Sequence, residues 1–214
     1  GFAQAAKNAV AAGCDGVEVH GATGYLVHQF ISDRANVRAD RWGGSVQGRI
    51  RFPLEVAAAI AAAVGPGRTG IRLSPLAAWQ DAPVSDPQAV YPPLIRELDR
   101  LGLAYVHCVE GEPGGINTRF EATASGFDFA GARRLFGGAW IANNGFDPGR
   151  AARKIVAGEA DLVSFGRPFI ANPDYPERVR RGAPLNELDP STTYGGKGEK
   201  GYTDYPALER EPAA

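Results

Sequence analysis

Three side chains that can donate a hydrogen bond or a proton stand close together near the start of the chain. His20, Thr23 and Tyr25 follow residues 15–19, an apolar run with the character of a strand. An imidazole and a hydroxyl at the end of a strand can polarise a carbonyl oxygen, and a phenol can deliver a proton nearby. The spacing therefore predicts a site that polarises a carbonyl group and protonates a neighbouring atom.

The elements that must position these side chains alternate along the chain. Apolar strands are expected over about residues 15–20, 70–74, 104–109, 139–143 and 161–165. Helices are expected over about 2–12, 24–31, 46–64, 85–101, 127–136 and 174–181, with one more after Asp147-Pro148. Continuous apolar strands separated by helices predict an α/β fold with a parallel sheet that helices cover.

The distribution of polar residues favours a (β/α)8 TIM barrel over an open doubly wound sheet. Polar and Gly-rich residues follow several different strands, whereas an open sheet would gather them at one switch point. The chain supplies about five βα units of such a barrel within residues 1–182. An eight-stranded barrel then needs three further strands. Residues 183–214, rich in Gly, Pro and Tyr, are expected to form a C-terminal extension.

Two loops have the composition of a phosphate site. Residues 143–146 follow the fourth predicted strand and residues 166–168 follow the fifth. If these are the seventh and eighth strands of a barrel, the two loops lie where barrels commonly bind phosphate through backbone N–H groups. Gly145 and Gly166 let the backbone approach a ligand, and Arg167 supplies charge. Ordinary turns with a surface arginine are the alternative. Arg72 is a lone charge inside a strand, so it needs a partner, and a buried ion pair is one reading.

Composition excludes several functional classes. The formal net charge is −1 and no basic run occurs, so no nucleic-acid partner is expected. No apolar stretch approaches the roughly 20 residues of a membrane span, and no signal peptide opens the chain. Cys14 and Cys108 are far apart, and we expect both to be buried and reduced, which fits a cytoplasmic protein. The chain contains no Met, so Gly1 is expected to be a processed or cut end.

These motifs together resemble the Old Yellow Enzyme family of flavin-dependent ene-reductases. The resemblance runs through residues 20–30, 36–45, 70–80, 143–146, 166–168 and 191–206, and it corresponds to the C-terminal two-thirds of the family fold. It implies an oxidoreductase that passes hydride from NAD(P)H, by way of FMN, to the C=C bond of an α,β-unsaturated carbonyl or nitro compound. It also implies that the five βα units are strands 4–8 of the barrel and that a partner chain or the rest of a longer parent chain supplies strands 1–3. The C-terminal extension would fold over the active site.

The resemblance also implies a role for each motif residue. His20 and Thr23 would hold the substrate oxygen, and Tyr25 would protonate the α-carbon. The residues implied for FMN are Arg72 at the pyrimidine edge and, at the phosphate, Asn144, Gly145, Gly166 and Arg167. Further substrate contacts are implied for Trp79, Gln80 and Tyr194. His28 and His107 are expected to be structural.

Departures from the family leave a second function open. The family usually has Asn or His at Thr23 and often Gly at Asn144, and its first three strands supply further flavin contacts. A non-catalytic or partner-dependent subunit that completes a barrel is therefore the alternative. A dienoyl-CoA reductase is a weaker one, because the chain lacks the cysteines of an iron–sulfur cluster.

Overall fold

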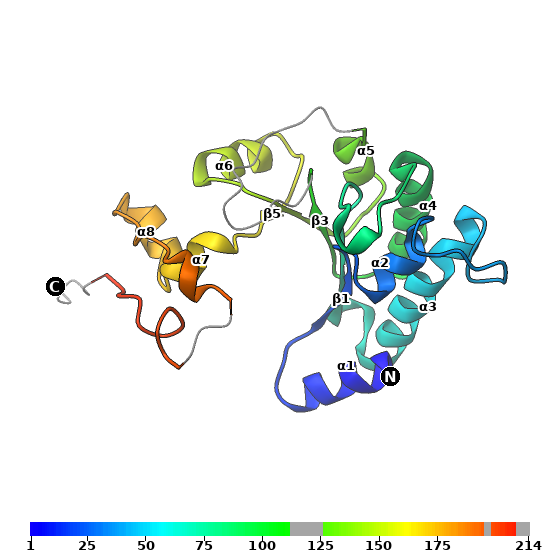
Figure 1. Cartoon of the computed structure of the whole chain (residues 1–214), viewed down its shortest axis with the longest axis horizontal. Helices are drawn as coiled ribbons and strands as arrows, with labels where there is room; N and C mark the ends of the chain where they lie inside the picture. Colours follow the sequence, from blue (N-terminus) through cyan, green and yellow to red (C-terminus); the bar gives the residue numbers. More distant parts are fainter. Residues whose placement is uncertain (112–125, 195–197, 209–214) are drawn as a thin grey trace.

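One sheet of five parallel strands forms the centre of the molecule (Figure 1). The computed structural model describes residues 1–111, 126–194 and 198–208. The strands lie side by side in chain order: β1 (Val17–Gly21), β2 (Thr69–Leu73), β3 (Tyr105–Val109), β4 (Ala139–Asn143) and β5 (Leu162–Val163). Each strand is parallel to its neighbour, so all five carboxyl ends meet at one edge of the sheet.

Helices connect successive strands, and Figure 1 shows α3 to α6 around the outer side of the curved sheet. The α-helices are α1 (Phe2–Ala11), α2 (Leu26–Ile31), α3 (Val46–Val64), α4 (Pro87–Arg100), α5 (Phe129–Arg133), α6 (Pro148–Val156), α7 (Arg167–Ala171) and α8 (Tyr175–Arg181). Three short 3-10 helices are η1 (Pro66–Arg68), η2 (Trp79–Asp81) and η3 (Pro190–Thr192).

Three of the helices that follow strands, α3, α4 and α6, begin at residues whose side chains cap them. The side chain of Ser45 accepts a hydrogen bond from Gly48 N at the start of α3, at 3.1 Å. Asp86 and Asp147 do the same for α4 and α6, each directly before a proline in the first turn. These caps satisfy backbone N–H groups that have no partner inside the helix. The three caps fix where the loops before α3, α4 and α6 end.

The outer face of the sheet carries the hydrophobic core. Ile71, Val106 and Trp140 are fully buried there, against apolar side chains of α3 and α4. Complete burial of one such aliphatic side chain stabilises a fold by about 1.5–3 kcal/mol. The arc of five strands therefore has a core of its own on this side.

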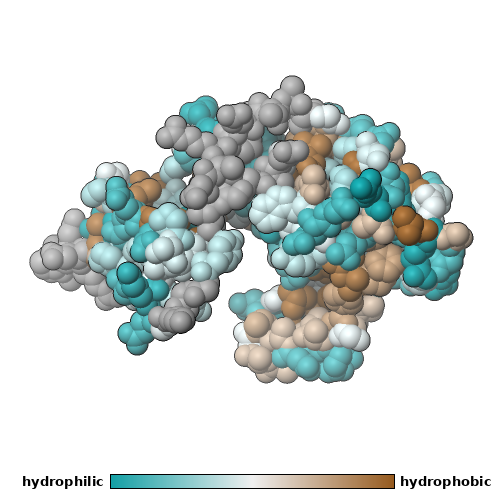
Figure 2. Space-filling model, viewed as in Figure 1, coloured by the Kyte–Doolittle hydropathy of each residue, from teal (hydrophilic) through white to brown (hydrophobic). Residues whose placement is uncertain are grey.

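The inner face of the sheet is polar, and no helix of the described residues covers it (Figure 1). Glu18 and His20 alternate with the buried Val19 along β1, and His20 pairs in register with Arg72 of β2. Leu162 on the edge strand β5 is 52% exposed. Figure 2 shows the molecule hollowed on this side, between α1 and the segment that holds α7 and α8. An open arc of a barrel has this arrangement.

Several elements differ from the sequence prediction. β5 is shorter than expected because it lies at the edge and pairs with β4 alone, although Asp161 N and Ser164 N still bond to β4 carbonyl groups. α7 was not predicted, since Gly166-Arg167-Pro168 was expected to be a loop. The short helix α5 covers only part of residues 127–136. Gly114 and Gly115, expected in the loop after β3, lie outside the described residues.

Two expectations about burial near the N-terminus are wrong. Cys14 is exposed, because it lies in the turn between α1 and β1, whereas Cys108 is buried as expected. The helical spacing of Phe2, Ala5, Ala6 and Val10 predicts that they share one apolar face of α1, yet Ala5 is exposed and Ala6 is the buried residue. α1 packs on α3, where the Phe2 and Phe52 rings lie 6.3 Å apart. Within the described ranges, no helix is both long and apolar enough to cross a membrane.

His28 is a buried titratable group in the core of the fold. It lies in α2 with no solvent exposure, and its Nδ1 atom is 3.1 Å from Ser74 Oγ. Burial lowers the pKa of His28 from 6.5 to about 4, and the backbone at Ala82 opposes this only in part. The structural role expected for His28 fits this position.

We predict that His28 makes the fold sensitive to acid. Below pH 6.5 the unfolded chain takes up a proton that the folded state refuses, so stability is lost as the pH falls towards 4. From about pH 7 to about pH 4.5, wild type should lose about 2 kcal/mol more unfolding free energy than His28→Asn. Urea unfolding at both pH values measures this difference. Parallel losses in the two proteins would contradict it.

Candidate functional site

The parallel register gathers the predicted residues at the carboxyl edge of the sheet. His20 of β1 lies opposite Arg72 of β2, and Arg72 lies opposite His107 of β3. Asn143 ends β4, and Ser164 directly follows β5. Residues far apart in the chain thus form one polar row on the inner face.

The three side chains of the first motif lie together. His20 Nε2 is 3.4 Å from Thr23 Oγ1, and the centres of the His20 and Tyr25 rings are 5.1 Å apart. Tyr25 is 53% exposed and lies directly before α2. Partial burial lowers the pKa of His20, and the charge of Arg72 lowers it further, against the effect of Glu18. A neutral imidazole beside a hydroxyl and a phenol can donate to a substrate oxygen without carrying a charge.

A buried hydroxyl holds the Thr23 loop in place. Thr23 has a positive φ of 50°, which is unusual for a β-branched residue. Its backbone N–H donates to Ser74 Oγ at 2.7 Å, and the same hydroxyl contacts His28. The sequence interpretation missed Ser74. Its position directly after the second strand was the one available signal.

The loop after β2 packs directly on the Thr23 loop. Gly24 has a φ of 78°, and a Cβ atom there would overlap the Trp79 carbonyl oxygen and lie 2.6 Å from Gln80 Cβ. Trp79 is 43% exposed, and Gln80 has a φ of 60°. The structure therefore brings both predicted substrate-lining residues beside the His20 motif.

One nitrogen atom of the Arg72 guanidinium has a hydrogen-bond partner, and another has none among the described residues. Its Nη2 atom donates to Asn143 Oδ1 at 2.9 Å. Its Nε atom is buried, and it has no hydrogen-bond partner in the part of the chain that the structure describes. A buried N–H without a partner is costly, so a ligand oxygen is a fitting acceptor. A flavin pyrimidine ring offers such oxygens, and the residues present fit that group.

The two predicted phosphate loops leave neighbouring strands at the same edge. Asn144 and Gly145 have φ angles of 107° and 66°, and Asn144 Nδ2 donates to the Glu110 carbonyl at 2.7 Å. The Glu110 carboxylate in turn pairs with Lys154 at 2.8 Å; burial raises its pKa and Lys154 opposes that rise. Gly166 has open space where a Cβ would be. The backbone around these loops is anchored and, at Gly166, accessible.

The C-terminal tail is attached to α8. The guanidinium of Arg178 donates to the carbonyl oxygens of Pro184 and Pro206, at 2.5 and 2.7 Å. Asp174 accepts from Leu208 N at 2.6 Å. Figure 1 shows this tail beside α7 and α8, away from β1. Tyr194 is 82% exposed, so its role at the site remains a prediction, as does the tail as a cover.

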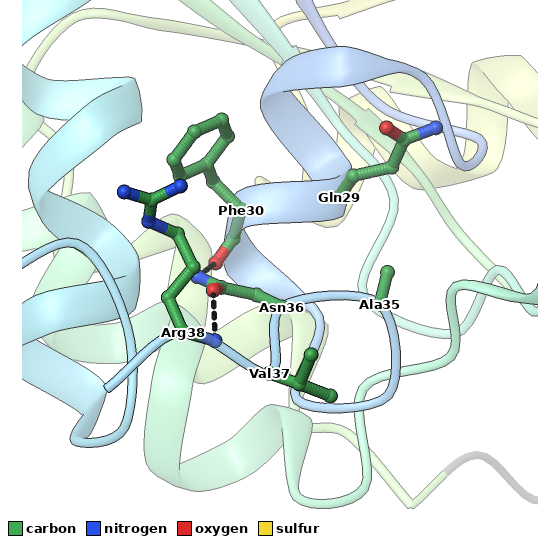
Figure 3. A pocket seen from close by; sticks show the side chains of 6 residues that line it. All are labelled: Gln29, Phe30, Ala35, Asn36, Val37 and Arg38. Carbon is green, nitrogen blue, oxygen red and sulfur yellow. Dashed lines mark hydrogen bonds between the residues drawn. The ribbon is translucent and has the colours of Figure 1, made fainter. Parts of the chain in front are cut away.

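A surface hollow of about 230 Å³ lies in the loop after α2 (Figure 3). Within it, Asn36 donates to the carbonyl oxygens of Phe30 and Trp42 and accepts from Arg38 N at 3.2 Å. None of the predicted site residues lines it; its lining is Gln29, Phe30, Ala35, Asn36, Val37 and Arg38. The hollow is a product of a tightly bonded loop. No group of three metal-ligating side chains occurs among the residues described.

We predict that the close contact at Gly24 holds the Thr23 loop against the loop that follows β2. Gly24→Ala should lose the fit between the two loops in addition to the cost of a positive φ. Gly158→Ala is the matched control, because Gly158 has a φ of 70° and nothing near its Cβ position. We expect Gly158→Ala to cost about 1–2 kcal/mol. Gly24→Ala should cost at least about 1 kcal/mol more, as measured by urea unfolding. Equal losses would mean that the loops do not constrain each other.

Comparisons with known proteins agree with this geometry. Residues 1–186 match the NADH:flavin oxidoreductase / NADH oxidase family. The chain is 42% identical to 12-oxophytodienoate reductase 2 of Arabidopsis thaliana over 97% of its own length and 55% of that protein.

Two solved structures have the same fold. Morphinone reductase in complex with tetrahydroNAD is 46% identical, with a TM-score of 0.87 over 97% of this chain and 54% of that one. An Old Yellow Enzyme homologue from Zymomonas mobilis is 38% identical, with a TM-score of 0.89 over 97% and 57%. The chain thus spans about half the length of its relatives, and its five-stranded sheet is part of a (β/α)8 barrel. It belongs to the NADH:flavin oxidoreductase / NADH oxidase family, which includes the Old Yellow Enzymes.

Proposed function

We propose that this chain carries the substrate site and the phosphate site of an FMN-dependent ene-reductase. The observation that carries the proposal is the cluster of His20, Thr23 and Tyr25 beside Arg72, whose buried Nε atom lacks an acceptor within the described residues. The substrate class is an alkene conjugated to a carbonyl or nitro group. NAD(P)H is the reductant, in line with the tetrahydroNAD complex of morphinone reductase.

Five residues of this chain would hold the cofactor. Arg72 would bind the pyrimidine edge, and the phosphate would lie on the two loops, with Asn144, Gly145, Gly166 and Arg167. The bound group supplies hydride transfer, through which electrons from NAD(P)H reach the C=C bond. The chain itself binds, orients and protonates the substrate.

His20 and Thr23 act on the substrate oxygen. His20 Nε2 and Thr23 Oγ1 lie 3.4 Å apart, so one substrate oxygen that faces both atoms can accept a hydrogen bond from each. Two such donors withdraw electrons from the conjugated C=C bond and favour attack at its β-carbon. Tyr25 stands beside His20 and holds a proton for the α-carbon. The loop of Trp79 and Gln80 closes one side of this space.

The proposed enzyme needs strands that this chain does not contain. Among the residues that the structure describes, no helix covers the inner face (Figure 1), and the relatives are about twice as long. We propose that a second polypeptide, or the rest of a longer parent chain, supplies the other strands of the barrel and the remaining flavin contacts. Unpaired edges at β1 and β5 are the surfaces that would receive them.

One observation favours a second candidate, a non-catalytic or partner-dependent subunit that completes a barrel. Thr23 has one hydroxyl, and in this structure that hydroxyl lies against His20. A site with one weakened donor would bind flavin without reducing alkenes. Flavin binding without alkene turnover, in the presence of the completing strands, would select this candidate.

The role of Tyr25 is tested by separating the two half-reactions. In the flavin-loaded protein, Tyr25→Phe should slow alkene reduction by about 10²-fold or more, because the phenol proton is lost. Flavin reduction by NAD(P)H should stay near the wild-type rate. Stopped-flow absorbance of the flavin follows each half-reaction. An equal loss in both would sink the role proposed for Tyr25.

A second prediction concerns the donor at position 23. Asn tolerates a positive φ better than Thr, and its amide reaches further. Thr23→Asn should therefore raise alkene affinity and turnover, by up to the roughly 10²–10³-fold that one oxyanion donor supplies. Thr23→Val, which keeps the shape and lacks the hydroxyl, is the control and should lower both. If Thr23→Asn has no better turnover than wild type, the threonine is not the limiting donor.

A further inference from the structure

A continuous series of hydrogen bonds crosses the inner face of the sheet, with one residue from each strand or from the end of it. Arg72 Nη2 donates to Asn143 Oδ1 at 2.9 Å, and Asn143 Nδ2 donates to Ser164 Oγ at 2.8 Å. Ser164 Oγ lies 2.8 Å from His107 Nε2, and His107 Nδ1 lies 2.9 Å from Glu18 Oε2. We refer to these five residues as the inner chain.

The donors of the inner chain run in one direction. Asn143 already donates to the Ser164 oxygen, so the Ser164 hydrogen is free to point at His107 Nε2. Nε2 is then the acceptor, and Nδ1 carries the hydrogen that goes to Glu18. Burial would raise the pKa of Glu18, but His107, Tyr105 and Arg72 outweigh it and lower that pKa. The series therefore runs from a guanidinium cation to a carboxylate anion.

A polarised series of this kind restricts the group at its donor end. Hydrogen bonds in a row strengthen one another where the dielectric is low. Asn143 fixes one Nη atom of Arg72, and the Asn143 amide is itself fixed by Ser164, through both Oγ and the carbonyl oxygen. The guanidinium plane is thereby set, and the unpaired Nε atom has one direction available.

A hydrolytic reading of the same residues is less well supported. Glu, His and Ser in this order also form the nucleophile of many hydrolases. Here Asn143 donates a hydrogen bond to Ser164 Oγ. This bond occupies a lone pair that the oxygen would need for attack on a carbonyl carbon. The continuation of the series to Arg72 has no part in such chemistry. It does explain how Arg72 is held.

We propose that Glu18, His107, Ser164 and Asn143 are positioning residues that fix the Arg72 guanidinium for its ligand. The inference rests on the proposed function in one respect, since it takes the ligand to be the pyrimidine edge of FMN. It assigns His107 more than the structural role expected from sequence. Under this proposal Ser164, which follows β5, fixes the orientation of Arg72 in β2.

The first test needs no flavin. In the full chain labelled with 15N, NMR should find His107 as the Nδ1–H tautomer. Ser164→Ala should shift both the His107 ring nitrogens and the Arg72 Nε–H signal, which lie on opposite sides of Ser164 in the inner chain. Ser164→Thr keeps the hydroxyl and should restore both. Ser32→Ala is the control, because that buried hydroxyl donates to Pro83 O outside the inner chain, and it should shift neither.

A second variant that interrupts the inner chain keeps the proposal testable if Ser164→Ala does not fold. Glu18→Gln keeps the shape of the side chain and removes the charge, so it should shift the Arg72 signal in the same direction by a smaller amount. An Arg72 signal that is unchanged in every folded variant would overturn the proposal. So would a wild-type His107 that carries its hydrogen on Nε2.

The second test joins the inner chain to the cofactor. FMN affinity, followed by quenching of flavin fluorescence, should fall about five- to tenfold in Ser164→Ala and stay within about twofold in Ser164→Thr. Equal FMN affinity in both, with the Arg72 signal shifted, would overturn the link to the cofactor. A wild type that binds no FMN even with the completing strands present would remove the proposed function instead, and the NMR result would still decide whether these residues position Arg72.

Discussion

The parallel register of β1 to β5 is the constraint on which the rest of the structure depends. Because all strands run the same way, their carboxyl ends share one edge, and every loop that carries chemistry leaves from that edge. The period of two along each strand then divides the residues between two faces. One face becomes the core under α3 and α4, and the other keeps polar groups such as His20, Arg72 and His107.

The two faces of the sheet are stabilised in different ways. The outer face buries apolar side chains such as Trp140 against helices of this chain, so it needs no other polypeptide. The inner face holds the charged groups of Arg72 and Glu18, and these are stable only where each has a partner. The series from Arg72 to Glu18 supplies the partners, and it leaves one Arg72 nitrogen for a ligand. The face with the chemistry is thus the face that the rest of a barrel would enclose.

Much of this fold could be predicted from the sequence, for local reasons. The limits of α3 follow from the Ser45 cap and from Gly65, and the motif from His20 to Tyr25 lies within six residues, so its spacing survives in the structure. The anchoring of Thr23 by Ser74 and the contacts of His107 join residues 51 to 89 positions apart. Such contacts depend on the register between strands, which no local pattern encodes. Cys14 was misjudged because composition alone does not tell a turn from a core.

The central claim is that these residues hold FMN in a barrel that other strands complete. Native mass spectrometry of the purified material, read together with its visible absorbance spectrum, tests it most directly. The account predicts a yellow species that contains the 214-residue sequence, further polypeptide and one FMN. A species that contains the completing polypeptide and yet stays colourless, with no flavin retained at saturating FMN, would contradict it.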